Sequence, residues 1–361
     1  MIALFLAVAA SFVASVVATP LLIKWLRARN IGQQIRDDGP VEHPHVKKVG
    51  TPVMGGFAIV GAAVVGYAVA HLRRHDFKFS RSGILLMALI VACMCVGAID
   101  DYLGIRNQRN LGLRKRGKLI GLIIIGALFA AAAVNWAGVS TKLSFTHELG
   151  IDLGAWGWGV LAVVIILATT NAANLTDGLD GLLSGTSILV FGVYAIIAFW
   201  EFRHFGHYLP TNGQALLTYP YTVQPAQALD LMTIAGAMLG GCTGFLWWNA
   251  APARIFMGDT GSMAIGGAMA GLALFTHTIL LLPILAGLCL VETLSVIAQV
   301  ISFRGFGRRV LRMSPIHHHF ELLGWPETTI TVRFWIFAGL CAAFGLGLFY
   351  ADFLRLPGVL N

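Results

Sequence analysis

The chain has 361 residues, of which 57% are hydrophobic and only 12% are charged. Ordinary soluble domains carry about one quarter charged residues, so this composition, with a mean hydropathy of +0.77, excludes a soluble protein and predicts one embedded in a membrane. The net charge of +8 does not indicate a nucleic-acid binder, because the Lys and Arg residues cluster in short segments beside apolar runs.

Ten apolar runs follow one another along the chain, each near the ~20 residues that cross a bilayer as a helix. We therefore expect an all-α integral membrane protein with about ten transmembrane helices, in a single polytopic domain over residues 1–361. The runs cover residues 2–21, 52–70, 83–99, 119–137, 157–173, 182–200, 229–247, 260–276, 279–302 and 334–354. All five cysteines lie in these runs and are expected to pack there rather than form disulfides or bind metal.

The basic residues predict the orientation of the chain. Lys24, Arg27 and Arg29 follow the first run and no basic residue precedes it, which is the reverse of a cleavable signal peptide. With both termini outside, most of the 25 Lys and Arg residues fall in inside segments, as the positive-inside rule favours. The basic loop at 71–82 would then face outside, against that rule, and its orientation stays open.

Acidic residues gather at the inside ends of the runs, where a carboxylate is costly and tends to be functional. Asp100 and Asp101 are adjacent in the sequence GAIDDYLG, at the end of the third run. Adjacent carboxylates repel unless a cation joins them, and Mg²⁺ prefers a few carboxylate oxygens together with water and phosphate. The alternative is an acidic pair neutralised by the arginines that follow it.

A second polar motif, NAANLTDGLDGL, follows the fifth run. Asn171, Asn174, Asp177 and Asp180 recur every three residues, a spacing that stacks side chains along one edge of a helical turn. Amides and carboxylates there can hydrogen-bond to a nucleobase or to sugar hydroxyls. The alternative is a capped turn between two spans, in which Asn, Asp and Gly are common.

The motif NAAPARIFMGDTGS leads into the eighth run and contains Asn249, Phe256 and Asp259. Asp259 stands where the helix starts, so it can cap the helix or bind Mg²⁺ beside an anionic diphosphate. Phe256 can stack on a base or anchor the chain at the membrane surface.

Three consecutive histidines, His317, His318 and His319, occupy the last inside segment in the sequence SPIHHHFE. They are too close in sequence for all three to face one metal ion from a helix. Imidazoles titrate near neutrality and donate hydrogen bonds to phosphate, which favours anion binding or proton handling over an exposed polar loop.

Three further polar residues are candidates. Lys48, in KKVGTPVMGG, can hold a phosphate or a lipid head group. Glu292 and Gln299 lie seven residues apart on one face of the ninth run, where polar residues either serve function or form hydrogen bonds between helices.

Taken together, these motifs closely resemble those of the phospho-N-acetylmuramoyl-pentapeptide transferase family of bacterial peptidoglycan synthesis. The resemblance covers nearly the whole chain. It rests on KKVGTPVMGG at 47–56, the Asp pair at 100–101, NLTDGLDG at 174–181, IFMGDTGS at 255–262 and PIHHHFE at 315–321. The last motif and GWPE at 324–327 separate this family from the wider polyprenyl-phosphate hexosamine-phosphate transferases. Val53 departs from the threonine usual in the family.

The resemblance implies transfer of phospho-MurNAc-pentapeptide from its UDP-linked form to undecaprenyl phosphate, which yields lipid I and UMP and requires Mg²⁺. It also implies a site on the cytoplasmic face of the bacterial inner membrane and suggests a homodimer. A related GlcNAc-phosphate transferase and an ion-coupled transporter are the alternatives, although a transporter would hold its acids nearer the bilayer midplane.

The resemblance also implies roles for single residues. Asp259 would bind the metal, and Asp100 would act on the acceptor phosphate with Asp101 in support. The nucleotide would be contacted by Asn171, Asn174, Asp177, Asp180, Asn249 and Phe256. The diphosphate and sugar would be surrounded by Lys48, Lys118, Gln299, His317, His318 and His319.

Overall fold

The computed structural model describes residues 1–29, 31–32, 50–72, 78–106, 113, 115–205, 207–208, 217–218 and 221–355. Helices make up most of the described chain. They are α1 (Ile2–Ala28), α2 (Gly56–Leu72), α3 (Arg81–Arg106), α4 (Lys115–Ala132) with the π-helical turn η2 (Ala133–Ala137), α5 (Gly154–Thr176), α6 (Leu182–Arg203), α7 (Pro225–Asn249), α8 (Gly258–Phe275), α9 (Leu282–Leu285), α10 (Gly287–Phe306), α11 (Ile316–Glu321) and α12 (Glu327–Leu354).

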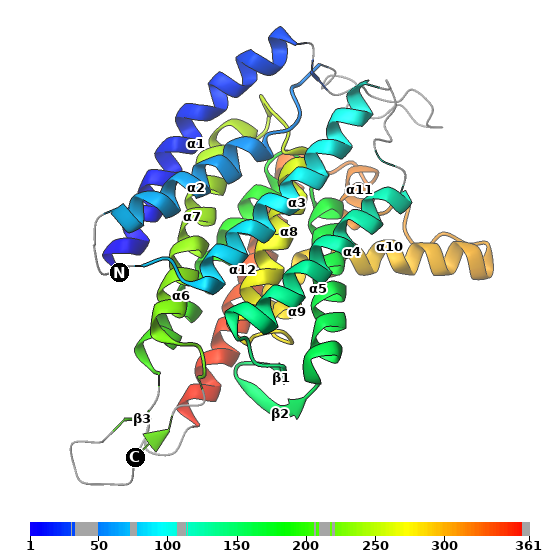
Figure 1. Cartoon of the computed structure of the whole chain (residues 1–361). Helices are drawn as coiled ribbons and strands as arrows, with labels where there is room; N and C mark the ends of the chain where they lie inside the picture. Colours follow the sequence, from blue (N-terminus) through cyan, green and yellow to red (C-terminus); the bar gives the residue numbers. More distant parts are fainter. Residues whose placement is uncertain are drawn as a thin grey trace.

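Two short antiparallel hairpins lie in the connections between helices. Strands β1 (Lys142–Ser144) and β2 (Glu148–Asp152) join α4 to α5, with Lys142 opposite Asp152 and Ser144 opposite Glu148. Strands β3 (His207–Tyr208) and β4 (Leu217–Thr218) lie between α6 and α7. Both hairpins extend from the end of the bundle that lies opposite α11 (Figure 1).

The prediction of an all-α multi-pass membrane protein is confirmed. Eight described helices, namely α1, α3, α4 with η2, α5, α6, α7, α10 and α12, are long and apolar enough to cross a membrane, and α2 is a shorter apolar helix. Each of the ten predicted runs contains helix. The run at 279–302 is interrupted, because a turn and the short α9 precede α10.

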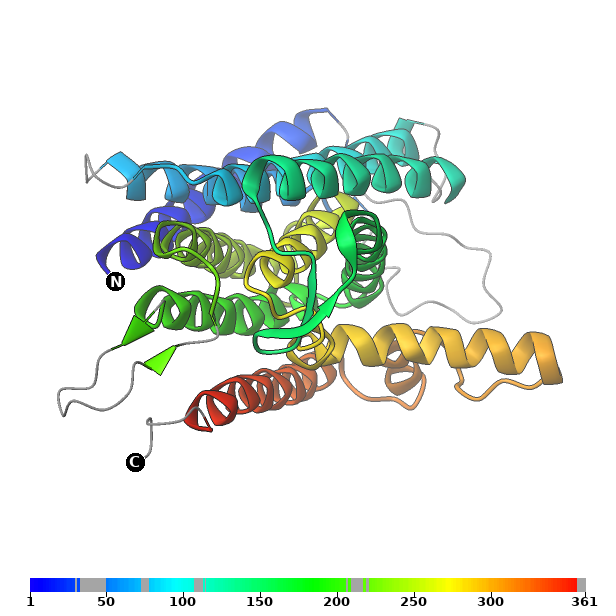
Figure 2. The same cartoon turned by 60° about the horizontal axis from the view of Figure 1, so that its bottom comes forward.

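Helix α8 lies in the middle of the bundle, between the side formed by α2, α3 and α4 and the side formed by α12 and α10 (Figure 2). Every residue from Thr260 to Phe275 is buried. The sequence explains this position, since AIGGAMAGLA is apolar all round and rich in small residues that let neighbouring helices approach closely. The start of α8, which carries Asp259, is thereby surrounded by other helices.

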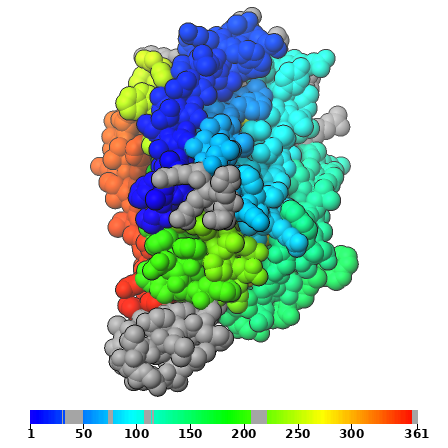
Figure 3. All heavy atoms as spheres, turned by 60° about the vertical axis from the view of Figure 1, so that its left-hand side comes forward, coloured from blue at the N-terminus to red at the C-terminus, as the bar shows by residue number. Residues whose placement is uncertain are grey.

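The face of the molecule on the left of Figure 1 carries α1, with α2 and α3 beside it (Figure 3). Ser11 and Ser15 of α1 donate hydrogen bonds to the backbone carbonyls of Ala237 and Gly241 in α7, at 2.6 and 2.9 Å. These bonds satisfy two hydroxyl groups away from water and fix α1 against α7.

The start of α3 is fixed by a buried carboxylate of α7. Asp230 accepts hydrogen bonds from the backbone N–H and the hydroxyl of Ser80, at 2.8 and 2.7 Å, and from the hydroxyl of Tyr67, at 2.9 Å. The Ser80 hydroxyl oxygen in turn accepts the N–H of Gly83 at 2.9 Å, as an N-cap does. These contacts hold in place the helix that carries Asp100 and Asp101 at its other end.

Candidate active site

The end of α3 and the start of α8 are joined by Asp101. Its carboxylate accepts the backbone N–H of Asp259 at 3.1 Å, the N–H of Thr260 at 2.9 Å and the hydroxyl of Thr260 at 2.5 Å. The first N–H groups of a helix have no partner within the helix, so Asp101 caps α8 from another helix. At Gly97 a β-carbon would overlap the backbone of Asp259, which explains why α3 has glycine at this contact with α8.

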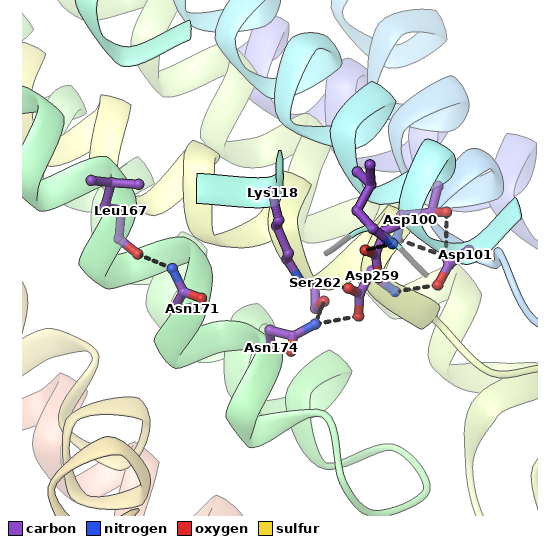
Figure 4. A network of polar contacts seen from close by, with 10 residues as sticks. Asp100, Asp101, Lys118, Leu167, Asn171, Asn174, Asp259 and Ser262 are labelled. Carbon is purple, nitrogen blue, oxygen red and sulfur yellow. Dashed lines mark hydrogen bonds and ion pairs between the residues drawn. The ribbon is translucent and has the colours of Figure 1, made fainter. Parts of the chain in front are cut away.

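Asp259 is held from two sides by side chains of other helices (Figure 4). Lys118 of α4 forms an ion pair with one carboxylate oxygen, and the amide of Asn174 of α5 donates a hydrogen bond to the other. Asn174 also donates to the hydroxyl of Ser262 at 3.1 Å. Side chains from α4, α5 and α8 therefore meet at one carboxylate.

Asp100 completes this cluster. Its carboxyl group lies within hydrogen-bonding reach of Asp259 and accepts the backbone N–H of Leu113 at 2.9 Å. Two adjacent residues of one helix thus serve different purposes, since Asp100 faces Asp259 while Asp101 caps α8. Two of the arginines that could have neutralised the acidic pair, Arg109 and Arg114, lie outside the described residues.

The segment that precedes α2 is anchored beside the cluster. The N–H of Phe256 donates to the carbonyl of Pro52 at 2.8 Å, and the N–H groups of Gly55 and Gly56 donate to the carbonyls of Phe256 and Met257, at 2.9 and 3.1 Å. The GTPVMGG motif is therefore paired through its backbone with the IFMGDTGS motif. Lys48, predicted to bind phosphate, lies outside the described residues.

Gly258 needs to be glycine for two reasons. It has a φ of +69°, a left-handed conformation that side chains with a β-carbon adopt at a cost. A β-carbon there would also lie 2.5 Å from Oδ2 of Asp101 and 2.8 Å from Cγ1 of Val53. The turn that delivers Asp259 therefore depends on this residue.

The DGLDG loop between α5 and α6 contributes Asp177 and Asp180. Burial, followed by the carboxylates of Asp259, Asp101 and Asp180, raises the pKa of Asp177 to about 8. Asp180 is buried and accepts the backbone N–H of Ala253 at 2.9 Å, while its own N–H donates to Glu327 of α12 at 2.8 Å. Asp177 thus belongs electrostatically to the carboxylate cluster, whereas Asp180 ties the loop to its neighbours.

The four motif residues at three-residue spacing do not share one edge. Asn171 is exposed, and its amide donates to the carbonyl of Leu167 in its own helix at 2.7 Å. Figure 4 shows it along α5 from Asn174 rather than at Asp259. Helix α5 ends at Thr176, so Asp177 and Asp180 leave the helical register in which the spacing was read.

Asn249 is buried and both ends of its amide are engaged. Its oxygen accepts the Ser184 hydroxyl at 2.9 Å, and its nitrogen donates to the carbonyl of Ile255 at 3.0 Å. The residue shapes the segment between α7 and α8 from inside. Phe256, which is partly exposed, lies on that segment next to the cluster.

The three histidines have different surroundings. His317 is fully buried, with Nδ1 3.0 Å from a carboxylate oxygen of Glu292, and a β-carbon at Gly178 would overlap its ring. His318 contacts Glu321 at 2.5 Å, and Nδ1 of His319 accepts the N–H of Arg312 at 3.1 Å. His317 therefore packs beneath the DGLDG loop, while the other two histidines are partly exposed on α11.

Gln299 also holds backbone in place. Its side-chain oxygen accepts the N–H groups of Val310 and Leu311 at 3.1 and 2.9 Å, and its nitrogen donates to the carbonyl of Leu311 at 3.1 Å. All these bonds fix the segment that returns from the end of α10.

Two contributors, Ser262 and Glu327, were not among the predicted site residues, whereas Glu292 was a candidate without an identified partner. Ser262 and Glu327 stand inside motifs that the sequence marks, GDTGS and GWPE. Glu292 is an intramembrane carboxylate, which is itself a signal of function or of a specific partner. Its partner, His317, is remote in sequence and could not be identified from spacing.

The cluster suits a divalent ion that keeps open positions. The carboxyl groups of Asp100, Asp101 and Asp177 each influence, or are influenced by, that of Asp259 electrostatically. Lys118 forms an ion pair with Asp259. Within the described parts of the chain no three Asp, Glu, His or Cys side chains converge closely enough to hold a metal by themselves. Mg²⁺ fits such a donor set, because it binds through one or two carboxylates plus water and substrate phosphate.

Comparison with known proteins agrees with this architecture. The model of glycosyl transferase family 4 matches residues 83–277, a range that includes Asp100, Asp101, Lys118, Asn174 and Asp259. The fold and the cluster thus define a multi-pass membrane protein of the glycosyl transferase type.

Relatives over nearly the full length narrow the assignment. Proteins named phospho-N-acetylmuramoyl-pentapeptide-transferase are 47% identical over 355 residues in Saccharopolyspora erythraea, covering 96% of each chain, and 48% identical over 350 residues in Frankia alni, covering 95% of this chain and 96% of the relative. The protein of that name from Salinispora arenicola is 43% identical over 380 aligned positions, covering 99% and 100%. The chain belongs to the phospho-N-acetylmuramoyl-pentapeptide transferase family.

Proposed function

We propose that this protein transfers phospho-MurNAc-pentapeptide from its UDP-linked form to undecaprenyl phosphate, releasing UMP, with Mg²⁺ as cofactor. One observation carries the proposal: Asp100, Lys118, Asn174 and Asp259 come from four helices and meet at one cluster, in a chain 43–48% identical to transferases of that name. The positive-inside distribution supports a cytoplasmic site in the inner membrane.

In the proposed reaction an oxygen of the acceptor phosphate attacks the sugar-bound phosphorus of the donor, and the P–O bond to UMP breaks. Both reactants are anions, so catalysis consists mainly of positioning and neutralising charge. Asp259 would hold Mg²⁺, which would supply positive charge to offset the negative charge of the diphosphate. Lys118 adds a fixed positive charge beside Asp259.

Each carboxylate has a distinct task in this scheme. Asp259 is oriented through both oxygens, by Lys118 and by Asn174, which suits a metal ligand. Asp101 fixes the backbone of Asp259 and acts as a positioning residue. Asp100 faces Asp259 and would orient the acceptor phosphate or take its proton.

We favour direct attack by the acceptor over a covalent phospho-enzyme. The acceptor phosphate is already an anionic nucleophile. The Asp259 carboxylate is hydrogen-bonded and ion-paired, and such contacts lower the nucleophilicity of a carboxylate.

The nucleotide would lie along the DGLDG loop. The pKa of Asp177 responds to the carboxylates of Asp259 and Asp101. Phe256 is partly exposed and precedes Asp259 by three residues. Asp180 and Asn249 would act by holding this loop and the 250–255 segment through the hydrogen bonds to Ala253 and Ile255.

The decisive experiment measures UMP release by the purified protein in detergent, with undecaprenyl phosphate as acceptor. UDP-MurNAc-pentapeptide should release UMP only when Mg²⁺ is present, and UDP-GlcNAc should not. Preference for UDP-GlcNAc would support the related transferase instead. Asp259→Asn should remove Mg²⁺-dependent turnover in a folded protein, and full activity of that variant would refute the metal assignment.

A further inference from the structure

Helix α10 projects sideways from the bundle, in contrast to the helices packed around α8 (Figures 1 and 2). Its first half is anchored, since Cys289, Glu292 and Ser295 are buried. Its second half is not, and the side chains of Ile301, Phe303 and Phe306 are 60, 54 and 77% exposed. We call residues 290–312 the α10 arm.

The two faces of the arm differ in character. Ser295, Gln299 and Ser302 form a polar stripe, and the returning segment covers its second half: Gln299 bonds to Val310 and Leu311, and the Ser302 hydroxyl donates to the carbonyl of Arg308 at 2.8 Å. Four exposed apolar side chains recur at spacings of four, three and four residues on another stripe, namely Leu290, Leu294, Ile297 and Ile301, and Val300, Phe303 and Phe306 are exposed outside that stripe. Such spacing marks one face of a helix.

The apolar stripe leads into a concentration of positive charge. Arg304 lies one helical turn beyond Ile301, and Arg308, Arg309 and Arg312 follow, all of them exposed. The Arg309 guanidinium lies 5.8 Å from the centre of the Phe303 ring. No acidic residue occurs between Glu292 and Glu321, so nothing within this stretch of sequence neutralises the four arginines.

We propose that the α10 arm is a docking surface for anionic phospholipids of the bilayer leaflet nearest the site. The apolar stripe lies among acyl chains, and Arg304, Arg308 and Arg309 contact head-group phosphates. Long basic side chains on an apolar helix reach toward the interface, and guanidinium groups pair well with phosphate. Charge decides the occupant: a second copy docked by the same face would bring two arginine clusters together, whereas an anionic head group complements them.

The test is local quenching of a fluorophore in nanodiscs. A bimane is attached at position 306 (Phe306→Cys) after the exposed Cys95 and the partly exposed Cys341 are replaced by Ser. Phosphatidylglycerol or phosphatidylcholine, each carrying a head-group spin label, is added at equal fraction to a phosphatidylcholine bilayer. We expect stronger quenching by phosphatidylglycerol. The affinity of the arm for phosphatidylglycerol, relative to phosphatidylcholine, should fall about fivefold for each arginine neutralised at low salt. The decrease should be smaller at high salt.

The variants isolate the arm. Arg304→Gln, Arg308→Gln and Arg309→Gln combined should abolish the preference for phosphatidylglycerol at position 306, while the same three positions changed to Lys should retain most of it. Arg312 is left intact because its Nη1 donates to the carbonyl of Leu322 at 2.7 Å.

A matched control neutralises three cations at the end of α1: Lys24→Gln, Arg27→Gln and Arg29→Gln. These residues are also exposed, and Arg29 likewise stacks on an aromatic ring, that of Trp25 at 4.6 Å. The control should leave the preference at position 306 unchanged. Equal quenching by both lipids in the parent protein, or an equal loss in the control, would overturn the proposal. So would a bimane signal that changes with protein density at fixed lipid composition, since a second copy would then cover the arm.

Discussion

The Asp101 carboxylate caps the first turn of α8 by accepting both the N–H and the hydroxyl of Thr260, at 2.9 and 2.5 Å. Because Thr260 follows Asp259 directly, the orientation of Asp259 depends on a side chain from α3. The two aspartates thus act in series, one as a support and the other as the proposed ligand.

Removing this cap should reduce stability as well as activity. We expect Asp101→Ala to lower the free energy of unfolding by about 0.5–2 kcal/mol, the usual cost of losing an N-cap, and to slow UMP release because Asp259 is displaced. Asp101→Asn keeps a side-chain oxygen acceptor and should retain more of both. Thermal unfolding in detergent and the donor assay measure these effects. If Asn and Ala were equally inactive while equally stable, a proton-transfer role would replace the positioning role.

Lys118 forms an ion pair with the carboxylate of Asp259, so under the proposed metal assignment it would compete with Mg²⁺ for that carboxylate. We expect Lys118→Gln to lower the Mg²⁺ concentration needed for half-maximal rate while lowering the maximal rate by about a hundredfold, since a fixed charge at the reacting phosphates is lost. A Mg²⁺ titration of UMP release separates the two effects. Lys142→Gln, which breaks the ion pair with Glu148 in the β1–β2 hairpin, serves as the control and should change neither. A higher Mg²⁺ requirement in Lys118→Gln would contradict the competition.

Gly258→Ala should clearly lower the stability and the turnover of the protein, although it adds only one methyl group. The substitution forces a residue with a β-carbon into the left-handed region, which costs about 1–2 kcal/mol, and it also crowds Asp101 and Val53. Gly61→Ala is the matched control, because no atom lies within 4 Å of a β-carbon at this position in α2, and it should be neutral or slightly stabilising. Thermal unfolding and turnover of the two variants can be compared directly. Equal behaviour of the pair would show that the turn tolerates side chains.

The buried contact between Glu292 and His317 should be visible as energetic coupling. We expect Glu292→Ala and His317→Ala each to destabilise the protein by about 1–3 kcal/mol, the cost of leaving a buried polar partner unsatisfied. The double variant should lose less than the sum, with a coupling of about 0.5–3 kcal/mol. Denaturant unfolding of the four proteins gives the cycle. Because His317 packs under Gly178, the donor KM should rise in these variants, and strict additivity with an unchanged KM would mean that the contact does not support the loop.

Hydropathy alone predicted the helices and the helix ends that carry the site residues, because a bilayer demands long apolar segments and penalises carboxylates within them. The cluster of Asp100, Lys118, Asn174 and Asp259 could thus be anticipated as residues that share one end of the bundle. Their pairing could not, since it depends on which faces of α3, α4, α5 and α8 meet.

The contacts of adjacent residues could not be told apart from the sequence. Successive side chains of a helix point about 100° apart, so Asp100 meets the side chain of Asp259 while Asp101 caps its backbone, and the three histidines have different surroundings. The apolar run at 279–302 also hides the turn before α10, because continuous hydropathy does not distinguish a straight span from a helix that changes direction. Asn249 and Gln299 were expected to contact substrate, and the bonds that hold them to backbone become visible only once the chain is folded.

The pKa of Asp177 leads to an expected dependence of stability on pH. In the folded, metal-free protein it is raised from 3.8 to about 8, so between these values the folded state holds a proton that the unfolded state has released. By linkage, stability must then fall as pH rises through this interval. The contribution of this group is fully present below about pH 4 and lost as pH approaches about 8. Asp177→Asn cannot ionise, so its melting temperature in EDTA should decline less between pH 5 and pH 8 than that of the parent protein. A parallel decline in both proteins would mean that other groups account for the dependence.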